Sequence, residues 1–241
     1  QDFPLDAVPR FQVVYRRDRW ATSPVNFDFL HASVGNRKPQ FWSLAVKDRG
    51  GTEVSRERIP WGEISLLNGD PIPVPLAVHT WCSEPYRVGK TLSECLLSAL
   101  ALGSAEVLND DPFESLLQSY WNFLNETVVV GAGCLIDLLP DNLIVSSENV
   151  LLSFDQEWAS GSKIFTPAVA FYRGLLYFLS RNAFALDRLA HAARFGPTHN
   201  DFLAAACRTV GVTPAEAAGQ LTYFEDAFRD LTLEKYGVID H

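Results

Sequence analysis

The sequence predicts an α+β fold, with a β-rich N-terminal lobe over residues 1–88 and a helical C-terminal lobe over residues 89–241. Short segments rich in β-branched and aromatic residues, separated by turn residues, make up most of the first lobe. Longer segments with apolar residues at helical spacing make up most of the second lobe. Because strands and helices segregate along the chain instead of alternating, a doubly wound α/β sheet is excluded.

The first lobe is predicted to be a set of short strands. The tetrapeptide DRGG, residues 48–51, predicts a tight hairpin between the last two of them. The Pro-rich segment 68–78 is expected to be extended, because each proline disfavours helix at the residue before it. The strand segments are 11–15 (FQVVY), 27–33 (FDFLHAS), 40–46 (QFWSLAV) and 52–59 (TEVSRERI).

The second lobe is predicted to consist of helices that flank one β-rich segment, residues 127–158. Asp111 as N-cap, Pro112 at the first helical position and Glu114 three residues after the cap mark the start of one helix. The turn SSEN, residues 146–149, predicts a hairpin inside the β-rich segment. The predicted helices are 90–108, 110–124, 167–181, 183–195, 199–211 and 213–231.

Composition and charge exclude several function classes. The net charge of the 241 residues is −9, and no long run of Lys and Arg is present, so the chain is not expected to wrap nucleic acid. No apolar run approaches the eighteen or so residues of a transmembrane segment, and no signal-peptide pattern is present. An acidic protein still binds a nucleotide when a metal ion bridges its carboxylates to the phosphates.

Four cysteines lie far apart, with no C-x-x-C pair. This spacing indicates a reducing compartment, and we expect a cytoplasmic protein in which most cysteines are small buried hydrophobic residues. The segment QDFPLDAVPR, residues 1–10, lacks an initiator Met and is typical of a linker. We therefore expect a further domain upstream in the same chain.

The segment from Asp137 to Asp155 contains the pattern most indicative of chemistry. Asp137 and Asn142 form a D-x-x-x-x-N motif, which is followed by LIV, a turn, VLLSF and Asp155. A strand, a tight turn and a returning strand would bring Asp155 back beside Asn142. Phosphoryl transfer requires such a set: a carboxylate facing the acceptor hydroxyl, and oxygen ligands for Mg²⁺.

This segment resembles the catalytic and metal-binding segments of the aminoglycoside phosphotransferase and choline kinase branch of the kinase-like fold. There the loop reads D-x-x-P-x-N, and apolar strands lead to an I-D-x-E or D-F-E end, to which FDQEW is similar. The order of NRKPQFWSLAV, GKTL, DLLPDN, FDQEW and FYRGLL also resembles kinase-like domains beside methyltransferases and glycosyltransferases in bacterial surface-polysaccharide enzymes. The resemblance implies a two-lobed protein-kinase-like fold with its active cleft between the lobes.

Residue by residue, the resemblance implies that Asp137 is the catalytic base and that Asn142 and Asp155 bind Mg²⁺. It implies that Glu157 supports the metal or acceptor site and that Arg173 is a partner of these carboxylates. The implied activity is phosphorylation, with ATP and Mg²⁺, of a hydroxyl on a small molecule or saccharide, in surface-glycan biosynthesis. The partners are then a nucleotide and that acceptor.

The cation that holds the nucleotide phosphates has several candidates. LAVKD imitates the V-A-I-K pattern and nominates Lys47. If 27–33 and 40–46 are the first two strands, however, the third strand places Arg56 or Arg58 at that position. The loop SVGNRKP would cover the phosphates with one glycine, Gly35, and Glu63 is the candidate partner of the cation.

Less specific interpretations remain open. Asp and Asn are common turn residues, so Asp137, Asn142 and Asp155 could simply connect buried strands, and Lys47 could be a solvated strand-end residue. Kinase-like loops usually carry His two residues before the base, where this chain has Leu135. That departure, the uncertain lysine and the poor glycine loop favour an alternative function: a non-catalytic, pseudokinase-like module that binds a glycan or partner, or regulates an attached glycosyltransferase or methyltransferase.

Overall fold

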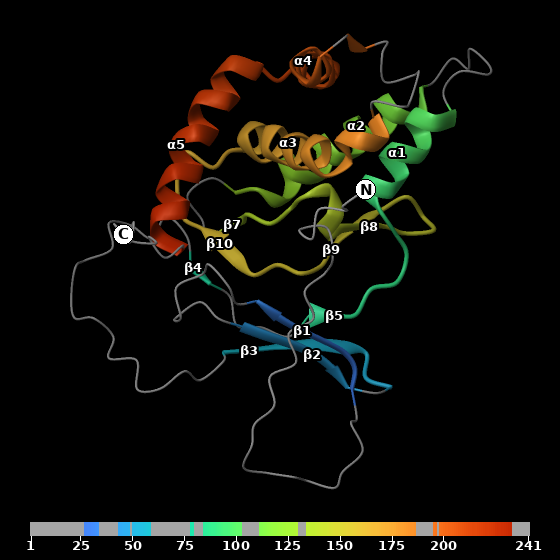
Figure 1. Cartoon of the computed structure of the whole chain (residues 1–241), viewed down its shortest axis with the longest axis vertical. Coiled ribbons are helices and arrows are strands. Elements are labelled where there is room, and N and C mark those ends of the chain that lie inside the picture. The colour runs from blue at the N-terminus through green and yellow to red at the C-terminus, as the bar shows by residue number, and fades with distance from the viewer. Residues whose placement is uncertain are drawn as a thin grey trace, which may run out of the picture. The chain divides into compact units, whose positions relative to one another are not determined.

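The computed structural model describes residues 27–33, 43–48, 50–58, 78–79, 84–102, 111–129, 134–186, 195–196 and 198–232. These residues form helices and small antiparallel sheets, which confirms the predicted α+β class (Figure 1). The chain divides into two compact units. The first unit contains β1, β2, β3 and β5, and the second contains β4, β6–β10 and the helices.

The described residues of the first unit form a four-stranded sheet in the order β1-β2-β3-β5. The Asp48 carbonyl accepts from Gly51 N at 2.9 Å and Gly50 has φ +75°, so DRGG forms the predicted tight turn between β2 and β3. The predicted strand at 11–15 lies outside the described residues. The strands of the sheet are β1 (Phe27–Ser33), β2 (Ser43–Asp48), β3 (Glu53–Arg58) and β5 (Glu84–Pro85).

One face of this sheet carries buried cations. Alternate residues of β2 are buried, and the series ends at Lys47. Ala45 pairs with Arg56 in the β2–β3 ladder, so Arg56 lies on the same face as Lys47. Both residues are buried. A buried position for each of these charged side chains requires specific partners, which are described with the candidate site.

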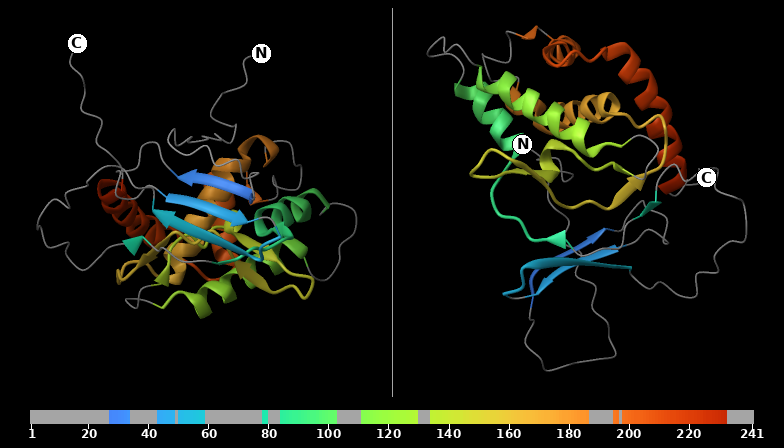
Figure 2. Two further views of the ribbon diagram at one scale, coloured as in Figure 1. Left: turned by 90° about the horizontal axis from the view of Figure 1, so that it is seen from below. Right: turned by 180° about the vertical axis from the view of Figure 1, so that it is seen from behind.

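The second unit packs three helices on one side of its small strands. Figures 1 and 2 show α1, α2 and α3 together on that side, with α4 beyond them. Their buried side chains form the core, in which Phe113, Tyr120, Phe171 and Phe178 are fully enclosed. The helices are α1 (Leu92–Leu102), α2 (Pro112–Thr127), α3 (Pro167–Leu186), α4 (His199–Thr209) and α5 (Pro214–Thr232).

The start of α2 is as predicted, whereas the end of α3 is not. Asp111 caps α2 by accepting from Phe113 N at 2.9 Å, with Pro112 at the first position. The sequence predicts that the third helix ends at residue 181, but α3 continues to Leu186. The Asn182 side chain donates to the Phe178 carbonyl one turn back, at 2.8 Å, and so does not break the helix.

Two small sheets position the D-x-x-x-x-N segment. One has the order β6-β8-β9 and the other β4-β10-β7. The turn at 146–149 joins β8 to β9, with Asn149 in the left-handed region at φ 58°, so the predicted hairpin is confirmed. The elements are β4 (Val78–His79), β6 (Lys90–Thr91), β7 (Cys134–Leu135), the 3₁₀ turn η3 (Pro140–Asn142), β8 (Leu143–Val145), β9 (Leu151–Ser153) and β10 (Trp158–Ser160).

Candidate functional site

The loop that carries Asp137 runs from β7 to β8. It is tied to β10 at its start, where Ile136 N donates to the Trp158 carbonyl at 3.1 Å. It ends in the 3₁₀ turn that Pro140 begins. The Asp137 side chain is 16% exposed, in contrast to its apolar neighbours Ile136 and Leu138, which are buried. The alternation of apolar and polar residues thus anchors the loop and leaves its carboxylate partly open.

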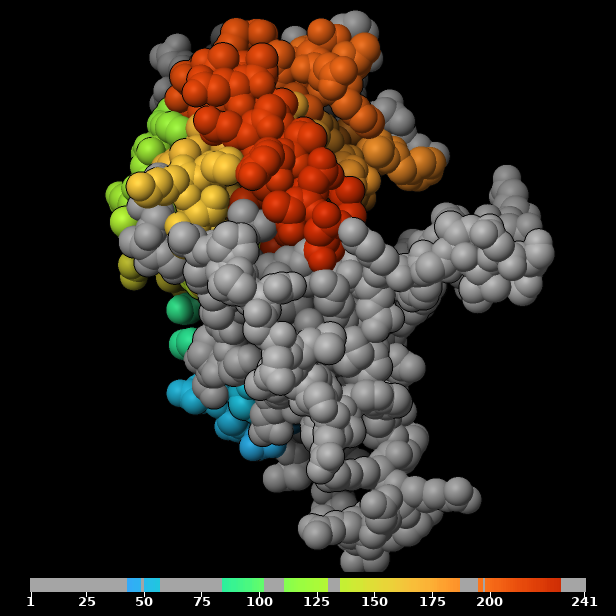
Figure 3. All heavy atoms as spheres, turned by 90° about the vertical axis from the view of Figure 1, so that its left-hand side faces the viewer, coloured from blue at the N-terminus to red at the C-terminus, as the bar shows by residue number. Residues whose placement is uncertain are grey.

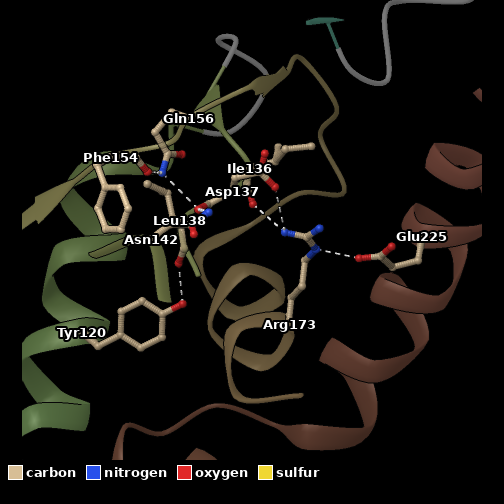
Figure 4. A network of polar contacts seen from close by, with 9 residues as sticks. All are labelled: Tyr120, Ile136, Asp137, Leu138, Asn142, Phe154, Gln156, Arg173 and Glu225. Carbon is tan, nitrogen blue, oxygen red and sulfur yellow. Dashed lines mark hydrogen bonds and ion pairs between the residues drawn. The ribbon is translucent and has the colours of Figure 1, made fainter. Parts of the chain in front are cut away.

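Three consecutive backbone carbonyls of this loop each accept from side chains (Figure 4). Arg173 Nη1 donates to Ile136 O at 2.8 Å, and the Tyr120 hydroxyl donates to Leu138 O at 2.7 Å. Between them, Asp137 O accepts from the side-chain amides of Asn142 and Gln156, each at 3.1 Å. Donors from α2, α3, η3 and the segment after β9 therefore fix the loop backbone on both sides of Asp137.

Arg173 joins this loop to α5. Its Nε donates to Glu225 Oε1 at 2.6 Å, and its Nη1 lies 3.6 Å from Asp137 Oδ1. Burial lowers the pKa of Arg173, but the two carboxylates outweigh burial, and the pKa of this guanidinium is raised above its usual range. Arg173 is therefore permanently cationic, and the expectation that it contacts the carboxylates holds for Asp137.

Asn142 is oriented by its own hydrogen bond. Its side-chain nitrogen donates to Asp137 O, so its oxygen, the atom that can bind a cation, lies on the opposite side of the amide. The assignment of nitrogen and oxygen follows from the acceptor, because a carbonyl accepts only from the amide nitrogen. This hydrogen bond therefore leaves the amide oxygen of Asn142, and not its nitrogen, on the side away from Asp137 O, as a metal ligand would need.

The hairpin brings the Asp155 segment back to Asn142, as the spacing predicts. Leu143 pairs with Ser153, and Phe154 N donates to Asn142 O at 3.0 Å. Asp155 follows directly and has φ +55°, in the left-handed region. A non-glycine residue in this region is uncommon, although Asp tolerates it better than most residues do, and such strain concentrates at functional sites.

Gln156 is the residue of this site that the sequence analysis missed. It is 5% exposed, and its amide donates to Phe154 O at 2.8 Å as well as to Asp137 O. It therefore ties the segment that carries Asp155 to the loop that carries Asp137. The signal in the sequence was the position of Gln156 between Asp155 and Glu157. A long polar side chain that is buried at such a position needs hydrogen-bond partners inside the fold.

The predicted Mg²⁺ ligands are one carboxylate, Asp155, and one amide, Asn142. Among the described residues, no group of three or more His, Cys, Asp or Glu side chains is arranged to hold a metal ion. Mg²⁺ commonly uses one or two carboxylates and takes its remaining oxygens from phosphates and water. The residues at this position fit such a phosphate-dependent site and not a metal site built entirely from protein.

The candidate phosphate-binding cations have partners within the first unit. The Lys47 ammonium lies 4.8 Å from the centroid of the Tyr86 ring, and Lys47 is only 8% exposed. The interpretation of Lys47 as a solvated strand-end residue is therefore wrong. Arg56 Nη2 pairs with Glu84 Oε1 at 3.4 Å across the β3–β5 ladder. Outside the described residues lie Gly35, Glu63 and the side chain of Arg58.

Comparisons with known proteins do not assign this chain to a family. No protein-family model, curated protein or solved structure matches it. Within the described part of the chain, no helix is both long and apolar enough to cross a membrane.

Tyr120→Phe is expected to destabilise the second unit by about 1–3 kcal/mol, because it leaves the buried Leu138 carbonyl without its hydroxyl donor. Burial raises the pKa of Tyr120, so the hydroxyl stays protonated and donates at any ordinary pH. Chemical denaturation measures the change. Exposed Tyr223→Phe is the matched control, and equal unfolding free energies for the two variants would contradict this role of Tyr120.

Gly174→Ala is expected to destabilise the protein more than a typical helix substitution does. A Cβ at this position would overlap the Tyr120 hydroxyl and lie 3.1 Å from Pro140 Cδ, so the helix would have to move away from the loop. Gly219→Ala on α5, where a Cβ would meet no atom within 4 Å, is the control and should be stabilising. A melting temperature that rises in both variants would show that α3 does not need this close approach.

Proposed function

We propose that the protein is a phosphotransferase that uses ATP and Mg²⁺ to phosphorylate a hydroxyl group, and that its two units are the lobes of a kinase-like fold. The observation that carries the proposal is the arrangement of the loop after β7. Asp137 lies in a loop whose backbone is held by four side-chain donors, and the β8–β9 hairpin returns Asp155 to the neighbourhood of Asn142. Turn residues alone do not require this network of side-chain donors.

Each residue then has a defined part in the reaction. Asp137 orients the acceptor hydroxyl and takes its proton as the hydroxyl oxygen forms a bond to the γ-phosphorus and the bond from that phosphorus to the β,γ-bridging oxygen breaks. Asn142 and Asp155 would hold Mg²⁺, which neutralises charge on the phosphates when it is bound. The products are the phosphorylated acceptor and ADP.

For the phosphates of the nucleotide we propose Arg56, with Lys47 as the second cation. The strands 27–33 and 43–48 precede β3, so Arg56 occupies the third strand of the sheet, where kinase-like proteins carry their phosphate-binding lysine. Its ionic partner among the described residues is Glu84. Arg binds phosphate through a planar fork and Lys as a point charge, so Arg56→Lys should weaken nucleotide binding.

The acceptor is proposed to be a saccharide, on the basis of the resemblance to kinase-like domains of surface-polysaccharide enzymes. A second candidate function is a non-catalytic binding or regulatory module. The observation in its favour is Leu135, which stands at the position where kinase-like loops usually carry His.

Magnesium-dependent hydrolysis of ATP, with water replacing the acceptor, distinguishes the two functions. We expect slow release of phosphate that stops when the metal is chelated. A protein that neither binds nor hydrolyses ATP in the presence of Mg²⁺ would be the non-catalytic module instead.

A further inference from the structure

Arg173 is shared between carboxylates from two segments far apart in the sequence. Arg173 Nε donates to Glu225 Oε1, on α5, at 2.6 Å. Arg173 Nη1 lies 3.6 Å from Oδ1 of Asp137, in the loop after β7. In Figure 4 the guanidinium lies between these two carboxylates, and Nη1 also donates to Ile136 O. Arg173 thus forms a hydrogen bond with Glu225, which lies outside the loop, whereas its contact with Asp137 is too long for a hydrogen bond.

Because Arg173 is buried, it matters how closely its guanidinium contacts each of the two carboxylates. The Arg173 side chain is 4% exposed, so water cannot replace a lost counter-charge. If the charge on Glu225 is removed, one of the two carboxylates at Arg173 is lost and the attraction to Asp137 is no longer opposed. The guanidinium is then expected to shift toward Asp137, close the 3.6 Å gap and engage the oxygen that faces it.

We infer that Glu225 is a positioning residue for Asp137 and acts through Arg173. By holding Arg173 at its Nε edge, Glu225 keeps Nη1 hydrogen-bonded to Ile136 O and 3.6 Å from Asp137 Oδ1. The inference rests on the proposed function, since as a base Asp137 must take up the proton of the acceptor hydroxyl. The contact between Glu225 and Arg173 would also anchor the loop after β7 without the histidine that kinase-like loops usually carry at the position of Leu135.

Glu225 can be substituted without disturbing the core. Its side chain is 24% exposed, on a helix that forms part of the surface of the second unit (Figure 3). The next residue, Asp226, pairs with Arg229 at 3.1 Å, and both of those side chains are more than half exposed. Asp226→Asn therefore removes one carboxylate from the same helix without reaching Arg173, and it is the matched control.

The experiment measures magnesium-dependent ATP hydrolysis and the Kd of Mg·ATP in parallel. Glu225→Gln is expected to lower kcat about tenfold, the effect of a modest misplacement of the base, with the Kd of Mg·ATP unchanged. Glu225→Asp keeps the charge, but its shorter side chain holds Arg173 less closely, so its kcat is expected to lie between those of the wild type and Glu225→Gln. Asp226→Asn should match the wild type in both measurements. Equal kcat in all four proteins would overturn the inference.

Hydrogen exchange of peptides that cover residues 134–142 separates this inference from the proposed function. Glu225→Gln is expected to increase amide exchange there, and Asp226→Asn is not. If the wild type does not hydrolyse ATP, the proposed function fails, and exchange alone decides whether Glu225 positions the loop: unchanged exchange overturns it. If Glu225→Gln does not fold, Glu225→Asp decides, since a lower kcat at unchanged Kd supports the inference and wild-type kcat overturns it.

Discussion

Asp155→Asn is expected to abolish magnesium-dependent nucleotide binding while the protein stays folded. The substitution removes the charge that Mg²⁺ requires but keeps a residue that tolerates the left-handed conformation observed at φ +55°. An effect on folding is therefore expected to be small, and a loss of binding can be assigned to the site. Titration calorimetry of Mg·ATP, with ATP in a chelator as the reference, measures the effect.

Two further variants make this result specific. Asp155→Gly removes the carboxylate and adopts a positive φ without strain, so it should fold and be equally unable to bind Mg·ATP. Glu148→Gln removes an exposed carboxylate from the turn of the same hairpin and should bind Mg·ATP normally. Normal binding by Asp155→Asn would show that this residue is a strained turn residue and not a metal ligand.

Asp137→Asn is expected to stop phosphoryl transfer and leave Mg·ATP binding intact. A positioned general base contributes on the order of 10²–10⁴-fold to a rate, and the amide cannot take up the acceptor proton. The loop itself should persist, because Arg173, Asn142 and Gln156 hold it through the backbone carbonyls of Ile136 and Asp137, which the substitution does not change.

Asp141→Asn is the matched control for this experiment. Asp141 lies in the same loop, but its carboxylate pairs with Arg181 at 2.6 Å and is not assigned a part in the chemistry. Single-turnover kinetics with pre-bound Mg·ATP separate transfer from binding. A rate that falls equally in both variants would show that loss of loop order, and not loss of a base, slows the reaction.

The sequence predicted the hairpin that brings Asn142 and the Asp155 segment together. Apolar strands on both sides of a four-residue turn specify an antiparallel ladder, and the equal lengths of its two arms determine which residues meet at its open end. The strand pattern of the first unit was predictable for the same reason. Its DRGG turn fixes the register that places Arg56 opposite Ala45.

The anchoring of the loop could not be predicted from the sequence. Its acceptors are main-chain carbonyls, which every residue has, so no motif marks Tyr120 or Gln156 as a donor to them. Glu225 comes 88 positions after Asp137 in the numbering of the chain, and only the packing of α5 near α3 brings it to Arg173. The sequence could nominate Lys47, but only the alternation of buried residues along β2 shows that it is buried.

A nucleotide site that needs both Mg²⁺ and Asp155 is the central feature of the proposed phosphotransferase. The melting temperature of the wild type and of Asp155→Asn, each with ATP alone, Mg²⁺ alone, both or neither, tests it in one experiment. Ligand at about a hundred times its Kd stabilises a fold by ~2.7 kcal/mol, which is readily visible as a shift. We predict a shift with ATP and Mg²⁺ together in the wild type that the variant lacks. The same melting temperature in all wild-type samples would contradict the account and favour the non-catalytic module.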